Sequence, residues 1–164
     1  NPTRRETDLA VLLARPRRGP LVTSKLTDYT LGLYASKDYV ARHGPIETRG
    51  RLVDHRLVGY VPDIVYAPEL RFLDELPNVG PVALRSSSIN AQARMIAAGA
   101  GLGVLPHFIG RLEASLVPVL PDITIQRSFW LVAHAETAAF PQVRAMRDWL
   151  RETVAAERGL FLPG

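Results

Sequence analysis

The stretch RSSSINAQ, residues 85–92, places three hydroxyl side chains next to each other at Ser86, Ser87 and Ser88, followed by Asn90. A short apolar segment precedes it and apolar residues at helical spacing follow it, so the serines are expected at the N-terminus of a helix. The unpaired backbone N–H groups and hydroxyls of such a helix start can hold a carboxylate or another anion. Capping of the helix by a single serine is the simpler alternative, and both remain open.

A glycine-rich stretch, AAGAGLGVLP at residues 97–106, raises the question of nucleotide binding. A dinucleotide-binding loop needs a strand before its glycines and a helix after them, because the helix N-terminus must face the pyrophosphate. Here the expected helix from Ser88 to Ala98 comes first and the expected strand from Leu102 to Leu105 follows. Gly99 is therefore predicted to end the helix, and no cofactor is expected.

Residue types that could support catalysis or hold a metal are poorly arranged. The sequence has no cysteine, and its four histidines lack the spacing of metal ligands. The serines lack the flanking glycines of a nucleophile elbow, and His107 after a proline is a weak candidate for a base. Glu69, Asp74 and Glu75 lie in a polar, loop-like run that is typical of a solvated surface. We expect no metal site and no enzyme activity.

Short apolar runs alternating with helical segments must position these residues. The expected strands are 8–14, 29–36, 56–61, 82–84, 102–105, 116–120 and 128–135, and the first is predicted to be buried on both faces. A helix should follow Ser36 and end at Gly44, and the longest should start at Pro141 and end near Gly159. One face of that last helix is expected to carry Phe140, Val143, Met146, Leu150 and Val154. Alternating strands and helices predict an α/β fold with a parallel sheet.

Length and composition set broad limits on the protein. With 164 residues the chain can form one domain or two small lobes, and 47% hydrophobic residues is ordinary for a soluble protein. No run approaches the length of a membrane span, and the first residues lack a signal peptide, which favours the cytoplasm and no membrane partner. The net charge is +4, but the basic residues are scattered, so a solvated surface is favoured over direct DNA contact.

Several segments, in their order, resemble the effector-binding domain of LysR-type transcriptional regulators. They are YASKDYVARHGPIETRGRLVDHRLVGY, AAGAGLGVLP and FWLVAHAETAAFPQVRAMRDWL, with RRETDLAVLLARP near the start. The resemblance covers nearly the whole chain. It implies a two-lobed, type II periplasmic-binding-protein-like fold with the first lobe only partly present. Residues 1–36 would form part of the first lobe and the first crossover, 37–128 the second lobe, and 129–164 the second crossover strand and the C-terminal helix.

The resemblance also implies where an effector would bind. The second-lobe wall of the interlobe cleft would lie after the strand that ends in GYVPD and at the helix start. The implied effector-binding residues are Gly59, Tyr60, Val61, Pro62, Asp63, Ser86, Ser87, Ser88 and Asn90, with Ser36 at a crossover. The serines suit an organic acid and Tyr60 suits an aromatic molecule, whereas Asp63 would repel an anion.

The function implied is that of an effector-sensing regulatory domain. Effector binding would be coupled to DNA binding by an N-terminal winged helix-turn-helix that this chain lacks, in a homodimer or homotetramer. A solute-binding protein of a transporter, which shares the fold, is the alternative.

Overall fold

The structure is a computed structural model that describes residues 7–64, 67–76 and 78–163. The chain divides into two compact units. Unit 1 consists of Asn1–Tyr29 and Gln126–Gly164, and unit 2 is Thr30–Ile125. Both are built from strands and helices, as the alternation in the sequence predicts.

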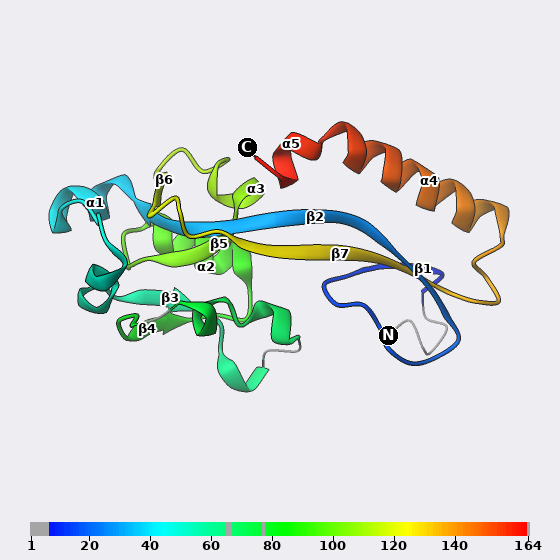
Figure 1. The fold of residues 1–164 in the computed structure, drawn as a ribbon, viewed down its shortest axis with the longest axis horizontal. Coiled ribbons are helices and arrows are strands. Elements are labelled where there is room, and N and C mark those ends of the chain that lie inside the picture. The colour runs from blue at the N-terminus through cyan, green and yellow to red at the C-terminus, as the bar shows by residue number, and fades with distance from the viewer. Residues whose placement is uncertain (1–6, 65–66, 77, 164) are drawn as a thin grey trace. The chain divides into compact units, whose positions relative to one another are not determined.

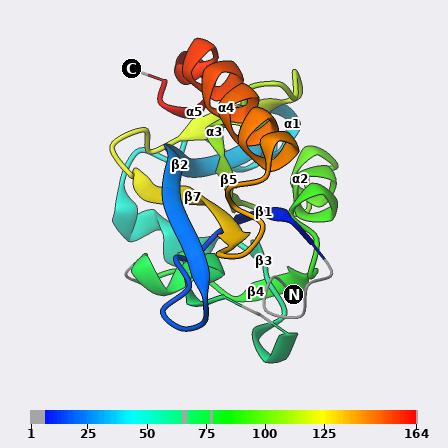
Figure 2. The same ribbon diagram turned by 90° about the vertical axis from the view of Figure 1, so that its right-hand side faces the viewer.

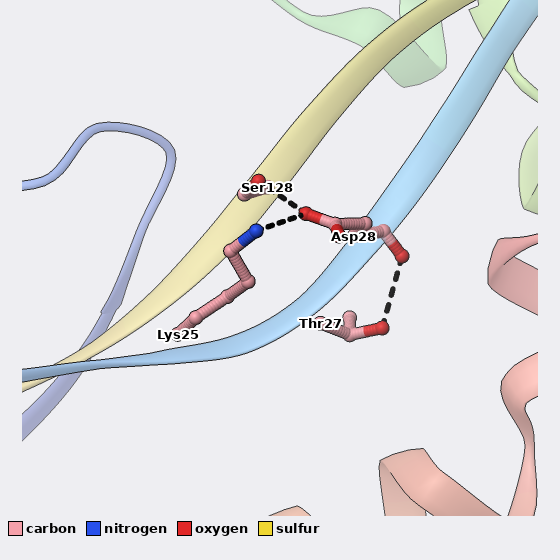
Figure 3. A network of polar contacts seen from close by, with 4 residues as sticks. All are labelled: Lys25, Thr27, Asp28 and Ser128. Atoms are coloured by element: carbon pink, nitrogen blue, oxygen red, sulfur yellow. Dashed lines mark hydrogen bonds and ion pairs between the residues drawn. The ribbon is translucent and has the colours of Figure 1, made fainter.

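Unit 1 is a small antiparallel arrangement of strands with a long helix on one side. Strand β7 (Ile125–His134) lies between β1 (Leu9–Leu12) and the first half of β2 (Leu21–Ser36). Helices α4 (Pro141–Ala156) and α5 (Arg158–Phe161) lie on one side of these strands (Figures 1 and 2). Polar contacts of Asp28 on β2 with Lys25 and with Ser128 on β7 tie the two long strands together (Figure 3).

Within its described residues, unit 2 contains the second half of β2, the strands β3 to β6 and three α-helices. The second half of β2 pairs with β5 (Gly103–Pro106) and with β6 (Leu116–Val119), and β3 (Leu57–Gly59) pairs with β4 (Val82–Arg85). The helices are α1 (Lys37–His43), α2 (Ile89–Ala97) and α3 (His107–Gly110). Short 3-10 turns at Arg49–Asp54, Pro62–Ile64, Pro68–Leu70 and Phe72–Glu75 connect these elements.

The prediction of a parallel sheet was wrong for most of the strand pairs. β1 pairs with β7 in the antiparallel direction, and so does β2 with both β5 and β6. The pair of β3 with β4 and the bridge between Leu57 and Leu102 are parallel. The alternation of strands and helices predicts the pairing only of strands that are neighbours in the sequence. β1 instead pairs with β7, which lies more than a hundred residues later and runs in the opposite direction.

The predicted burial of β1 and the predicted end of the last helix were also wrong. β1 is not buried on both faces, because Val11 is 47% exposed and Leu9, Ala10 and Leu12 are only half-buried. Helix α4 starts at Pro141 as predicted, yet it ends at Ala156, short of Gly159. Val143 is 4% exposed, whereas Met146 is 51% exposed. Leu150 and Val154, further along the same face, are half-buried.

The predicted helix ends in unit 2 are confirmed. The Ser88 hydroxyl accepts a hydrogen bond from the backbone N–H of Ala91 and caps α2. At the other end Gly99 has a φ of +78°, and its N–H and that of Ala100 donate to the carbonyls of Ile96 and Met95. This hydrogen-bond pattern is a Schellman motif, which ends a helix. The glycine-rich stretch therefore closes α2 and leads into β5, which excludes the dinucleotide loop.

A small apolar core holds α2 against the strands of unit 2. It comprises Tyr34, Val58, Ala93, Ile96, Leu105 and Leu116. Gly103 lies directly under α2, since a Cβ there would come within 2.4 Å of the Ile96 Cδ1 atom. This contact holds the C-terminal part of α2 close against β5.

Candidate functional site

A cavity of about 240 Å³ lies in unit 2, beside the β3–β4 pair that is labelled in Figure 1. The two strands provide one wall, α2 contributes Gln92, and the 3-10 turns at Pro68–Leu70 and Phe72–Glu75 with the residue between them provide the opposite wall. The lining residues are Val58, Gly59, Tyr60, Pro62, Leu70, Arg71, Phe72, Leu73, Asp74, Val82, Arg85, Gln92 and Val104. Apolar side chains and a few polar groups together are typical of a small-molecule site.

Buried apolar residues hold the two turns against the sheet. Leu70 and Phe72 are both buried, while Arg71 between them is exposed. The Phe72 ring meets that of Tyr60 edge to face, with centroids 6.0 Å apart. Such aromatic contacts are worth about 0.5–1.5 kcal/mol beyond the area that they bury. The alternation of buried and exposed positions therefore leaves Arg71 exposed on a firmly packed turn that lines the cavity.

Gly59, the last residue of β3, sets how closely the turns approach. A Cβ at this position would lie 2.7 Å from Leu73 Cδ1 and 3.3 Å from Val82 Cγ1. Both atoms belong to lining residues of the cavity. A larger residue at position 59 must therefore displace Leu73, which changes the shape of the cavity.

Three charged side chains line the cavity. The Nη1 group of Arg85 donates a hydrogen bond of 3.1 Å to the backbone carbonyl of Tyr60. The side chains of Arg71 and Asp74 make no hydrogen bond or ion pair with any residue that the structure describes. The charged wall therefore carries one positive charge more than negative, and part of that charge is available to a ligand.

Gln92 brings a buried polar group to the cavity. Its side chain is 2% exposed, and its Nε2 group donates a 2.9 Å hydrogen bond to the carbonyl of Ser86. The N–H of Ser86 in turn donates to the carbonyl of Gly59. These bonds connect the start of α2 to the end of β3, so the amide both lines the cavity and fixes the segment between β4 and α2.

The predicted site residues fall into two groups. Gly59, Tyr60 and Pro62 line the cavity. The remaining predicted residues are not on its wall; they are Val61, Asp63, Ser86, Ser87, Ser88, Asn90 and Ser36.

Some of these other residues have structural contacts of their own. The hydroxyl of Ser36 accepts from the N–H of Tyr39 and caps α1. The hydroxyl of Ser86 accepts from the N–H of Ser88, whose own hydroxyl caps α2. Ser87 and Asn90 are exposed. An effector contact of any of these residues stays a prediction.

Half of the residues that line the cavity but were not predicted come from the segment 70–74. The charged positions of this segment favoured a solvated loop, yet the alternation of Leu70 and Phe72 with Arg71 was a sign that one side is buried. Gln92 carried a second signal, because it shares a helix face with Ile89, Ala93 and Ile96. Arg85 has no comparable signal, since only the fold places it opposite Tyr60.

Two tyrosine–histidine pairs lie elsewhere in unit 2. The hydroxyl of Tyr34 is 2.6 Å from Nδ1 of His107, and that of Tyr39 is 3.0 Å from Nδ1 of His55. Burial raises the pKa of both tyrosines and lowers the pKa of both histidines. The neutral forms are thus favoured in each pair, which suits hydrogen bonding inside the unit.

Within residues 7–64, 67–76 and 78–163 there is no group of three or more side chains that could hold a metal ion. In the same part of the chain, no helix is both long and apolar enough to cross a membrane.

Known proteins similar to this chain include one curated regulator and several solved domains. The HTH-type transcriptional regulator AbaB of Streptomyces antibioticus is 28% identical over 169 residues, which cover 91% of this chain and 52% of AbaB. The chain therefore spans about half the length of this relative.

The solved structures show the fold. The regulatory domain of CrgA, a LysR-type transcriptional regulator from Neisseria meningitidis, superposes with a TM-score of 0.77 at 22% identity, over 92% of this chain and 76% of that chain. The CcmR regulatory domain of Synechocystis PCC6803, solved in complex with 2-PG, gives a TM-score of 0.69 at 18% identity, over 92% of this chain and 74% of that one. The predicted two-lobed, type II periplasmic-binding-protein-like fold is thereby confirmed.

The sequence itself matches one protein family over most of its length. This family is described as the LysR substrate binding domain, and the match runs from residue 3 to residue 155. The chain therefore belongs to the LysR substrate-binding domain family.

Proposed function

We propose that this chain is the effector-sensing domain of a LysR-type transcriptional regulator and that the cavity of unit 2 binds the effector. The observation that carries this proposal is the cavity itself. It combines an apolar wall with two guanidinium groups, and one of these, on Arg71, has no ion pair within the described part of the chain. A domain of this family with such a cavity is suited to recognise a small organic molecule.

Coupling to DNA is part of the same proposal. The similar protein AbaB is an HTH-type regulator of about twice the length of this chain. We assign DNA binding to a helix-turn-helix segment outside this chain, in a homodimer or homotetramer. Residues 37–128 are assigned to the second lobe, and 1–36 with 129–164 to the first lobe and the crossovers. An effector changes DNA binding only if it binds one state of the protein more tightly than the other.

A solute-binding protein of a transporter is less well supported. The family match and the similar proteins are those of transcriptional regulators. No observation in the described structure favours transport over regulation.

A ligand screen with blocked cavity variants tests the proposal. The chain is screened against small metabolites by thermal shift, and each hit is measured by calorimetry. Gly59→Val should lower the affinity for every true effector at least tenfold, because the valine side chain displaces Leu73. Gly50→Val is the matched control, since nothing lies within 4 Å of a Cβ at position 50.

Leu73→Trp fills the same cavity from the opposite wall. This second variant keeps the test possible if Gly59→Val does not fold. Hits whose affinity is unchanged in both folded cavity variants would bind elsewhere and would contradict the proposed site. If no member of a broad metabolite set stabilises the chain, the assignment of the cavity as an effector site is wrong.

A further inference from the structure

We propose that the cavity takes a monocarboxylic acid whose apolar body is about the size of one ring. This inference rests on the proposed function, because it names the chemical class of the ligand for that cavity. Four features of the cavity carry it: its volume, the apolar part of its wall, the balance of charges and the anchoring of Arg85.

The volume limits the size of the ligand. Pockets for drug-sized molecules usually measure about 300–1,000 Å³. A dry, apolar cavity of about 150 Å³ is known to hold one benzene molecule. The cavity here, at about 240 Å³, therefore has room for a single ring or a branched aliphatic chain, together with one carboxylate.

The apolar part of the wall fixes where that body can lie. Val58, Leu70 and Phe72 are buried lining residues, and each has an exposed fraction of 5% or less. An apolar body against them is removed from water without the cost of ordering the wall, which is already packed. A ligand made only of polar groups would lose its own hydration against these side chains.

The charges favour one negative charge on the ligand. Arg71 and Arg85 provide two guanidinium groups and Asp74 one carboxylate, so the wall attracts an anion. A single carboxylate on the ligand balances the excess positive charge. A second carboxylate would have to share the same two guanidinium groups or face Asp74, and this repulsion disfavours a dianion.

Arg85 is the better positioned of the two arginines. One of its N–H groups is already held by the carbonyl of Tyr60, at 3.1 Å. A guanidinium has five N–H donors, so the others remain for a carboxylate. Because the side chain is partly fixed before the ligand arrives, less conformational entropy is lost on binding. Arg71 adds a second guanidinium from the packed turn between Leu70 and Phe72.

Matched acid and amide probes test this inference on the chain itself. Benzoate, phenylacetate, cyclohexanecarboxylate and 4-methylpentanoate are each compared with the corresponding amide, and terephthalate supplies the dianion. Binding is followed by shifts of the backbone amide resonances of Gly59, Tyr60 and Gln92. At least one acid should bind at least tenfold more tightly than its amide, and terephthalate should bind at least tenfold more weakly than that acid.

Arginine variants then identify the groups responsible. Arg85→Gln and Arg71→Gln should each lower the affinity for the acid at least tenfold and leave the weaker affinity for the amide unchanged. Arg94→Gln is the control, because Arg94 is an exposed arginine of α2 that does not line the cavity. All three positions are exposed, so these variants are expected to fold.

The outcomes separate this inference from the proposed function. If no acid binds, if amides bind as tightly as acids, or if both arginine variants bind the acid normally, the inference is wrong. A different result would be a neutral or cationic metabolite that binds the wild-type chain and fails to bind Gly59→Val. This result would support the cavity as an effector site but would contradict its assignment to acids. If Gly59→Val and Leu73→Trp both leave every hit unchanged, the proposed site fails as well.

Discussion

The hydroxyl of Ser128 on β7 donates a 2.5 Å hydrogen bond to Oδ1 of Asp28 on β2, across a hundred residues of sequence (Figure 3). The ammonium of Lys25 approaches the same oxygen at 2.9 Å. Both contacts favour the ionised carboxylate, and together, with that of Ser128 the stronger, they lower the pKa of Asp28 below its ordinary value of 3.8. A single carboxylate thus connects the two long strands of unit 1.

This arrangement predicts a specific acid sensitivity. Because the folded pKa of Asp28 is lower than the unfolded one, its contribution to stability is complete above pH 3.8 and is lost as the pH falls through the folded pKa. The free energy of unfolding, measured with urea at a series of acidic pH values, should fall less steeply in Asp28→Asn than in the wild type.

Asp122→Asn is the control for this experiment. Asp122 pairs with Arg49, but both side chains of that pair are more than half exposed, and such pairs contribute little to stability. Equal acid slopes in the wild type and in Asp28→Asn would contradict the role assigned to the Ser128–Asp28 bond.

The pair of Tyr34 and His107 predicts a second pH dependence. Burial lowers the pKa of His107 below 6.5, with a smaller effect of Arg111, so the unfolded chain binds a proton more readily than the folded one. Stability should therefore be highest above pH 6.5 and should decline as the pH falls from 6.5 to the folded pKa of this group.

The variant His107→Gln should remove part of this decline. The melting temperature is followed between neutral and mildly acidic pH, and the variant should show the flatter profile although its overall stability is lower. His55, whose pKa is lowered by burial and then by His43, contributes to the same decline, so a residual slope is expected. A variant with the wild-type slope would show that His107 is not protonated on unfolding in this range.

Close packing around the same pair predicts a large effect at Gly110. A Cβ there would lie 2.4 Å from the Tyr34 ring, which is itself 1% exposed and held by His107. Gly110→Ala should therefore destabilise the chain by about 1–3 kcal/mol through overpacking. Gly50→Ala, where the added methyl meets open space, should change the free energy of unfolding by less than about 0.5 kcal/mol. Similar urea midpoints for the two variants would contradict this account.

Local signals in the sequence predicted the helix ends but not the strand pairing. Capping and terminating residues affect only the adjacent helix turn, so they can be recognised from the local sequence. The predicted ones, Ser36, Gly44, Ser88 and Gly99, each cap or end a helix in the structure. The strand 29–36 was placed correctly, but β2 starts eight residues earlier, at Leu21. That first half, LVTSKLTD, was missed because it has neither a continuous apolar run nor a regular alternation of polar and apolar residues.

The cavity shows the same division between local and long-range information. Gly59 ends a recognisable strand and Tyr60 and Pro62 come just after it, so they were predicted from position in the chain and from the resemblance. Arg71 and Arg85 line the same cavity, but their charge indicated only an exposed surface. Burial of Leu70 and Phe72 and the bond from Arg85 to the Tyr60 carbonyl depend on tertiary packing, which a single sequence does not report.

The serines at the start of α2 allow the two possible positions of the effector to be distinguished. Ser88 caps the helix through Ala91, so Ser88→Ala should lower the free energy of unfolding by about 1 kcal/mol. Ser87 is exposed and does not line the cavity, so Ser87→Ala should leave the stability nearly unchanged. If the effector lies in the cavity, neither variant should change its affinity in calorimetry by more than about twofold. A loss of tenfold or more in Ser87→Ala would instead place an anionic group of the effector at the N-terminus of α2, as the sequence first indicated.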